Sequence, residues 1–410
     1  MRRWRKYILF LIIAISTGCC VPINDDAICP IGCNTECVTI NIDSAKSVES
    51  FFFSSLLEPP CTIVLESSDR CVIRNIHSID IYENNIYILD DVSNKLFVFG
   101  IDGSFLYCIG HRGKGRGEYT ELSDFSIDKE KGCVYLWDPV TKTALKYDIH
   151  KREYITSIKM DIGGYDSYSL MFYNEKLYVN RTSIEMDSEN YLLSEIEESS
   201  GKELAKYLRA SEYNHGWNFP LRLQYGNFYL KNTSSPIFVE LFTDTIVSFT
   251  KEGVRPMYVI RSDDFVKDKD INKFIEHCNE NRDYNIFNLD SHLIFMPQGF
   301  MDMGNHVLFE MMSAGRLFYV LYNKETKETQ KSPLFTNDYV SSECYVAANM
   351  IFCDGNSVIS VLTNDFIPYF EEEIVANGLL NKDIDKYDDL TQLNETSNPV
   401  LFYYKCKKYK

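Results

Sequence analysis

The sequence repeats itself at a spacing of 48 residues between positions 78 and 155. Tyr87 recurs as Tyr135, and Asp90 recurs as Asp138. Each copy contains four short runs rich in isoleucine, valine and aromatic residues, separated by turn-forming pairs such as Asp102-Gly103. This pattern predicts four short strands joined by tight turns. A single unit of this kind leaves its edges and faces exposed, so the repeat predicts a fold in which several units pack together.

Fainter copies of the unit continue downstream, and about six units fit between residue 60 and residue 410. The strand-like runs are at 176–180, 226–230, 242–249, 305–309, 317–321, 349–352 and 358–361. Because β-propellers contain ~4–8 four-stranded blades, we expect an all-β, six-bladed β-propeller over residues 38–410. An array of β-sandwiches is the alternative, although it would not require units this similar in sequence.

Two further expectations concern the closure of the ring and its insertions. An N-terminal strand, either Val38–Ile42 or Cys61–Leu65, should pair with Val400–Tyr404 so that both ends of the chain share one blade. The stretches 262–284 and 371–392 are polar, with apolar residues at helix-like spacing, and we predict that they form short helical insertions.

Residues 1–18 have the features of an export signal. Four cationic residues precede an apolar run from Tyr7 to Ile15, which is far shorter than the ~20 residues that span a bilayer. Small residues then lead to Cys19, as in bacterial lipoprotein signals, in which this cysteine is lipidated and becomes the new N-terminus. Ser16 departs from the leucine usual at that position, and simple secretion is the alternative. We predict a tether over residues 19–37 and lipid anchoring to the outer membrane, on an undetermined side.

Several segments resemble a known family. The run Gly115-x-Gly117-Glu118-Tyr119, followed by 122–128 and 134–138, resembles the NHL-like repeat. More closely, the chain resembles the six-bladed β-propeller lipoproteins of Bacteroidales, a family with no assigned biochemical function. The lipoprotein-like start, the segment 244–258 and the closing run Asn398-Pro399-Val400-Leu401 also fit. The resemblance implies that the glycine-rich segment joins the outer strand of one blade to the inner strand of the next.

Charge limits the kinds of partner. The chain carries a formal net charge of −17, which becomes −21 without residues 1–18, so nucleic acid is an unfavourable partner. The exception is the glycine-rich stretch 110–119, "GHRGKGRGEY", which we call the basic loop. It is not a phosphate-binding P-loop, because Gly115 follows Lys114 and a strand, not a helix, comes next.

Two ligand contacts are predicted from loop residues. The basic loop is a candidate contact for an anionic glycan or an acidic protein surface; alternatively, its charges are only solvated and pair with Glu118 and Glu121. Trp217 is a candidate for stacking on a sugar, or else it anchors its own loop. The candidate ligand-binding residues are therefore His111, Arg112, Lys114, Arg116 and Trp217.

The sequence lacks the common hydrolase motifs, including Gly-x-Ser-x-Gly and His-Glu-x-x-His. Asp90 and Asp138 could face a central channel, as acidic and amide residues do in calcium-dependent lactonase propellers, or cap turns. The cysteines 29, 33 and 37 do not have a recognised zinc spacing. Cys61 with Cys71, or Cys344 with Cys353, could form a local disulfide.

These observations predict a lipid-anchored envelope propeller that binds a ligand or an outer-membrane partner protein. We predict no catalytic residue, cofactor or metal site. A calcium-dependent lactonase or another propeller hydrolase is the alternative function, and a pure scaffold is a third.

Overall fold

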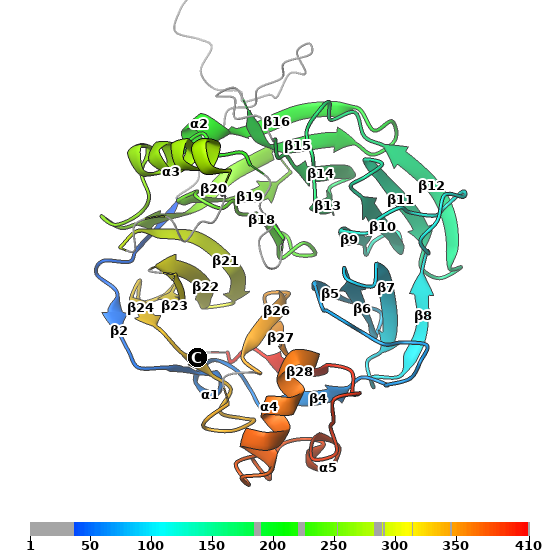
Figure 1. The fold of residues 1–410 in the computed structure, drawn as a ribbon, viewed down its shortest axis with the longest axis vertical. Helices are drawn as coiled ribbons and strands as arrows, with labels where there is room; N and C mark the ends of the chain where they lie inside the picture. Colours follow the sequence, from blue (N-terminus) through cyan, green and yellow to red (C-terminus); the bar gives the residue numbers. More distant parts are fainter. Residues whose placement is uncertain are drawn as a thin grey trace, which may run out of the picture.

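The computed structural model describes residues 37–183, 190–219, 226–251, 253–282, 289, 292–313, 315–344 and 347–408. Six antiparallel sheets stand around a central axis like the blades of a propeller (Figure 1). Each blade begins with its innermost strand and proceeds outward, as the family resemblance implied for blades 1 and 2. The predicted all-β, six-bladed propeller with short helical insertions is therefore confirmed.

Each blade has four main strands. From the axis outward they are β5 (Ser78–Tyr82), β6 (Asn85–Asp90), β7 (Lys95–Gly100) and β8 (Phe105–Ile109) in blade 1; β9 (Asp124–Asp128), β10 (Cys133–Asp138), β11 (Thr143–Asp148) and β12 (Glu153–Lys159) in blade 2; β13 (Leu170–Tyr173), β14 (Lys176–Asn180), β15 (Tyr191–Glu197) and β16 (Glu203–Arg209) in blade 3; β17 (Phe228–Tyr229), β18 (Ile237–Phe238), β19 (Thr245–Thr250) and β20 (Gly253–Arg261) in blade 4; β21 (Ile294–Met303), β22 (His306–Ser313), β23 (Arg316–Asn323) and β24 (Thr329–Ser332) in blade 5; and β26 (Asn349–Cys353), β27 (Ser357–Leu362), β28 (Val400–Lys405) and β4 (Cys61–Val64) in blade 6.

The hydrophobic core lies between neighbouring blades. Every residue of β10 is buried, because this strand lies inside a blade that has another blade against each face. Tyr135 of blade 2 stacks on Phe172 of blade 3 with ring centroids 4.8 Å apart. The aromatic residues of the strands thus pack between blades, where each buries a large apolar area.

The N-terminal segment runs along the outer edges of three blades before the first blade begins (Figure 1). Strand β1 (Val38–Asn41) adds to β20 in parallel, and β2 (Lys46–Ser47) adds to β24 in parallel. Strand β3 (Phe51–Phe52) then pairs with β25 (Phe335–Thr336) and leads into α1 (Phe53–Leu56).

The chain then closes the ring in blade 6, where β4 pairs antiparallel with β28. The predicted pairing of Cys61–Leu65 with the C-terminal strand is confirmed. The alternative pairing of Val38–Ile42 is wrong, because that segment lies on blade 4.

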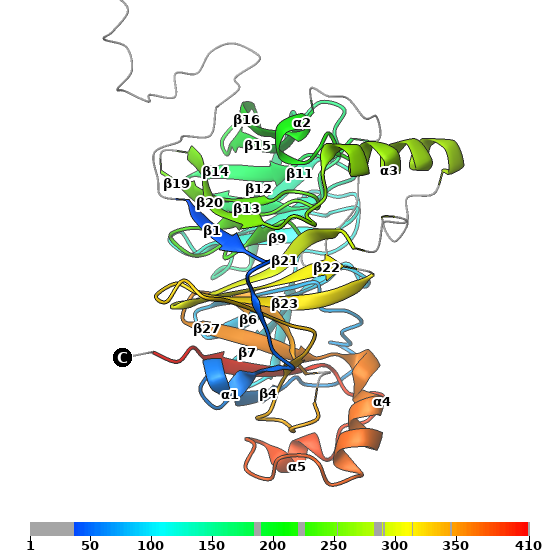
Figure 2. The same cartoon turned by 90° about the vertical axis from the view of Figure 1, so that its left-hand side faces the viewer.

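The two faces of the ring carry different connections. Because successive strands are antiparallel, the links from one blade to the next lie on the same face as the links between second and third strands. We call this the crossing face. It carries the basic loop, α2 (Ala210–Tyr213) and α3 (Asp268–Asn281), and Figure 2 shows α3 and α4 projecting on the same side.

The largest insertion lies between β27 and β28. It contains a continuous helical stretch made of η2 (Asn364–Phe366), α4 (Ile367–Tyr369) and η3 (Phe370–Val375), followed by α5 (Tyr387–Leu390). The helix expected in 262–284 is α3. The helical expectation for 371–392 holds in part, because the helical stretch begins earlier and only short segments follow it. In the described ranges no helix is long and apolar enough to cross a membrane.

The local disulfides that the sequence left possible are not formed. Cys61, Cys71 and Cys353 carry free thiols, so neither the Cys61–Cys71 nor the Cys344–Cys353 pairing is present. Cys353 is buried among apolar groups, and this desolvation raises the pKa of its thiol.

Candidate functional site

The basic loop connects β8 of blade 1 to β9 of blade 2, as the family resemblance implied. Its glycines allow the chain to pass from one blade to the next. Gly117 has a φ of +78°, and a Cβ there would lie 2.8 Å from the ring of Tyr154. Glycine is therefore required both by the backbone conformation and by the close contact, which agrees with a structural role for these glycines.

One of the four candidate residues of this loop, His111, is held by a local contact with a carboxylate. His111 Nε2 lies 2.7 Å from Glu118 Oε1, and the Gly115 N–H donates to Glu118 Oε2 at 2.6 Å. These two groups, with the backbone N–H the larger contributor, hold the pKa of Glu118 below its ordinary value. The pairing with Glu118 that the sequence suggested as an alternative is confirmed for His111.

The other three candidate residues, Arg112, Lys114 and Arg116, keep their charges in solvent. Arg112 Nε donates to the carbonyl of Thr120 at 3.0 Å, and the Arg116 guanidinium lies 5.6 Å from the ring of Tyr154. Lys114 is exposed. In the described part of the chain, none of Arg112, Lys114 and Arg116 forms an ion pair with a carboxylate. The loop therefore presents three exposed positive charges on the crossing face.

Trp217 is not exposed to a ligand. Its side chain is 2% exposed and packs against Phe219, Phe242 and Phe274, with the Phe274 ring stacked at 5.4 Å. Both faces of the indole are occupied by protein, so stacking on a sugar would require this cluster to open. The packing agrees with the alternative in which Trp217 anchors its own loop.

Asp90 and Asp138 cap turns at the ends of β6 and β10. Asp138 Oδ1 accepts from the N–H groups of Val140 and Thr141, and Oδ2 accepts from Thr120 N at 2.7 Å. Asp90 makes equivalent bonds with its own turn and with Arg74 N. Each aspartate thus connects its own turn to the segment through which the chain enters that blade. Neither carboxylate faces a central channel.

The groups that do reach the centre of the ring come from a segment we call the channel loop, residues 230–236 between β17 and β18. Lys231 Nζ of this loop lies 2.6 Å from Asp124 Oδ1 on β9 and 3.0 Å from the carbonyl of Phe125. The side chains of Lys231 and Asp124 are 17% and 5% exposed. Leu230, at the start of the loop, has a left-handed φ of +54°, which a leucine rarely adopts.

The same loop contacts two further blades. Asn232 Nδ2 donates to Asp80 Oδ2 on β5, and Asp80 also pairs with Lys129 at 3.0 Å. Tyr173 of β13 donates its hydroxyl to the carbonyl of Ser234 at 3.2 Å. A loop of blade 4 thus fastens blades 1, 2 and 3 across the axis, and both inward-facing aspartates have cationic partners.

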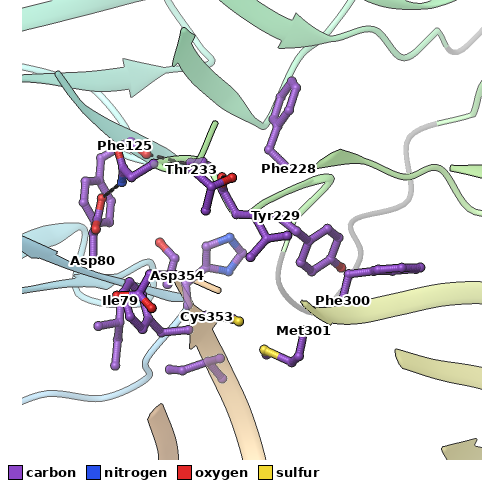
Figure 3. A pocket seen from close by; sticks show the side chains of 17 residues that line it. Ile79, Asp80, Phe125, Phe228, Tyr229, Thr233, Phe300, Met301, Cys353 and Asp354 are labelled. Carbon is purple, nitrogen blue, oxygen red and sulfur yellow. Dashed lines mark hydrogen bonds between the residues drawn. The ribbon is translucent and has the colours of Figure 1, made fainter. Parts of the chain in front are cut away.

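A small cavity lies beside the channel loop, with about 70 Å³ of free volume. Figure 3 shows the rings of Phe228, Tyr229 and Phe300 on one side of it and Asp80 with Ile79 on the other. The sulfur atoms of Met301 and Cys353 also face this space. The cavity is mainly apolar, and its volume suits only a few atoms.

Two acids lie near this cavity, close to Tyr229: Glu240 is buried and Glu310 is half-buried. Glu240 accepts from Asn227 Nδ2 at 3.1 Å and from Leu241 N, and burial raises its pKa to about 7. Glu310 accepts from Gln298 Nε2 at 3.1 Å, and burial raises its pKa to about 7 as well. In the described ranges neither acid has a lysine or arginine partner.

No group of three or more histidine, cysteine, aspartate or glutamate side chains suitable for a metal ion occurs in the part of the chain that the structure describes. Cys19, the predicted lipidation site, lies outside the described residues, as do Cys29 and Cys33. The sequence did not single out Lys231, Asn232, Glu240 or Glu310, because each acquires its role from partners in other strands or blades.

The fold defines the class of the molecule as a six-bladed β-propeller. The chain belongs to the DUF4934 family, described as a domain of unknown function, whose family model matches residues 37–405. The NHL-like character of the repeats and the lipid anchor remain predictions. No curated protein sequence matches the chain significantly.

Several solved structures are similar to this chain, among them two from Bacteroides. An exported protein, so described, from Bacteroides fragilis has a TM-score of 0.70 at 18% identity, covering 90% of this chain and 99% of that one. A member of the DUF4221 family from Bacteroides vulgatus has a TM-score of 0.48 at 10% identity, covering 86% of this chain and 98% of that one. At 18% identity the first similarity supports the fold alone.

Proposed function

We propose that this protein is a lipid-anchored binding module of the bacterial envelope that recognises a ligand or partner on its crossing face and carries out no chemistry. The observation that carries the proposal is the occupation of the ring's centre by the channel loop. Lys231 neutralises Asp124, and Lys129 neutralises Asp80. A calcium ion bound to these carboxylates would have to displace an ammonium group that already lies within hydrogen-bond distance.

Recognition is then left to the outer surfaces, and the crossing face is the more elaborate one. It carries α3, the insertion between β27 and β28, and three exposed cations of the basic loop. Loops mounted on a rigid scaffold commonly carry binding functions. An anionic glycan or an acidic protein surface fits the charge of the basic loop.

A thermal-shift panel tests the proposal and its lactonase alternative together. Calcium, lactones, neutral glycans, and uronic or sulfated glycans are added to the purified protein, and a ligand at 100 times its Kd stabilises the fold by about 2.7 kcal/mol. We expect no shift with calcium or lactones. A calcium shift in the wild-type protein would favour the hydrolase alternative. A shift with acidic glycans that is lost in Arg112→Ala/Lys114→Ala/Arg116→Ala would place the ligand on the basic loop.

The variant Lys231→Met tests the role given to the channel lysine in the same assay. Removing one partner of a buried ion pair costs about 3–5 kcal/mol, and the methionine leaves the Asp124 carboxylate without its cation. We expect a strongly lowered melting temperature that calcium partly restores. Lys151→Met is the control, because Lys151 is 72% exposed and its pair with Asp148 spans 3.5 Å, and exposed pairs contribute at most about 1 kcal/mol. Equal melting temperatures for the two variants would refute the cross-channel role.

Lipid anchoring is tested in cells with Cys19→Ser. We expect the wild-type protein to incorporate labelled palmitate and to sediment with membranes, and the variant to do neither. Cys20→Ser is the matched control and should behave as wild type. Unchanged membrane fractionation of Cys19→Ser would contradict the anchor and leave simple secretion.

A further inference from the structure

The helical stretch Asn364–Val375, which we call the acidic helix, exposes an aromatic stripe. Phe366 and Tyr369 lie one turn apart and are 48% and 46% exposed, while Ile367 and Phe370 beside them are buried in the core. Neighbouring large apolar side chains that share one side of a helix and remain in solvent are a candidate interaction surface.

The charges around the stripe determine what charge a binding partner must carry. Glu371, Glu372 and Glu373 follow it directly and are exposed. The insertion 364–395 contains nine acidic residues and two lysines. Within the described ranges, none of these three glutamates pairs with a lysine, arginine or histidine. A partner that covers the stripe must therefore bring positive charge.

The basic loop of this same chain has the complementary chemistry. Its exposed Arg112, Lys114 and Arg116 have no carboxylate partner within the described residues. Arginine pairs with carboxylates through two parallel hydrogen bonds and also stacks on aromatic rings. The acidic helix presents both kinds of group side by side, so the two surfaces suit each other.

The topology places the two surfaces where a second copy can use both at once. The acidic helix follows the second strand of blade 6, and the basic loop leaves the outer strand of blade 1, so both lie on the crossing face. They are separated by blade 1. A second copy can be generated by a half-turn about an axis that lies in the crossing face and passes through blade 1. This rotation places the basic loop of each copy opposite the acidic helix of the other. The same contact then forms twice, as in a symmetric dimer.

We propose that two copies of this chain associate through their crossing faces, with the acidic helix of each copy on the basic loop of the other. This inference rests on the proposed binding role of the crossing face and names the partner as a second copy. The basic loop, which is positively charged in an otherwise acidic protein, then contacts the acidic helix of the second copy, and no separate ligand is needed.

Sedimentation velocity with a charge exchange tests the dimer. One variant carries Glu371→Lys/Glu372→Lys/Glu373→Lys, and the other carries Arg112→Glu/Lys114→Glu/Arg116→Glu. We expect the wild-type protein to dimerise more weakly in high salt, because salt screens exposed charges. Each variant alone should dimerise at least about tenfold more weakly, because like charges then face each other. Mixed together, the two variants should form a heterodimer, since both contacts are again between opposite charges.

The matched control is Glu325→Lys/Glu328→Lys, which reverses exposed acids in the turn between β23 and β24 on the opposite face. It should dimerise as wild type. A wild-type protein that is monomeric at every concentration and salt, or a dimer that both charge variants leave intact, overturns the inference. Ligand binding in the thermal-shift panel is measured independently, so failure of the dimer is distinguishable from failure of the proposed function.

Discussion

Deleting residues 398–410 is expected to prevent the ring from folding. The deletion removes β28, which lies between β27 and β4 and pairs with both. Val400, Leu401, Phe402 and Tyr404 are fully buried, and burying each such side chain contributes roughly 2 kcal/mol. The sum, roughly 8 kcal/mol, is comparable with the 5–15 kcal/mol that stabilises a typical domain. Circular dichroism should show no cooperative melting of the truncated protein.

The same deletion removes the link between the last blade and the first. Asn398 Oδ1 accepts from Ile73 N, and its Nδ2 donates to the carbonyls of Glu66 and Cys71. The control is a shorter deletion of residues 408–410, which follow the last strand and should leave the melting temperature unchanged. A protein lacking residues 398–410 that melts cooperatively at the wild-type temperature would show that the ring does not depend on this closure.

The ring and its closure were predictable because both leave local patterns. Blades 1 and 2 repeat the same alternation of strands and turns, and the run from Val400 to Tyr404 is apolar enough to require a place inside a blade. The path of Val38–Asn41 was not predictable. The sequence of a short apolar strand does not show whether the strand pairs antiparallel inside a blade or adds in parallel to an outer edge, as β1 does on β20.

The candidate site was less predictable than the fold, for a physical reason. Lys231 pairs with Asp124 across 107 residues of sequence, and its own surroundings, Lys-Asn-Thr-Ser-Ser, read as an ordinary polar turn. The glycines of the basic loop were placed correctly, because positive φ and close packing are local requirements. Trp217 was misleading, since its polar neighbours in sequence conceal the aromatic cluster that surrounds it in space.

The second large effect concerns the buried Glu240 and the half-buried Glu310, which should make the fold less stable as pH rises. Both have a pKa of about 7 in the folded protein, against an ordinary value of 4.5. Below pH 4.5 both states hold the proton, and between 4.5 and 7 only the folded state does. Stability therefore falls through this window by about 1.4 kcal/mol per pH unit for each acid, or roughly 3 kcal/mol for each acid in total.

The groups that face these acids cannot compensate for their charge. Glu240 faces the amide of Asn227 and the hydroxyl of Tyr229, and Glu310 faces Gln298, Tyr229 and Tyr319. The proximity of Glu310 and then Glu240 adds to burial in raising the pKa of Tyr229. Ionising either acid therefore leaves a negative charge among amides and neutral phenols, which costs free energy.

Glutamine tests this account, because its neutral amide resembles the protonated acid in shape. Urea denaturation of Glu310→Gln should give wild-type stability near pH 5 and higher stability than wild type near pH 8, with a flatter dependence between them. Glu240→Gln should show the same flatter dependence but lower stability than wild type near pH 5, because both oxygens of Glu240 accept hydrogen bonds and the glutamine Nε2 cannot accept. Glu371→Gln is the control, since Glu371 is exposed and should leave the curve unchanged. If both glutamine variants instead follow the wild-type curve at every pH, both acids must have cationic or solvent partners when ionised, and these two acids would not be the source of the pH dependence.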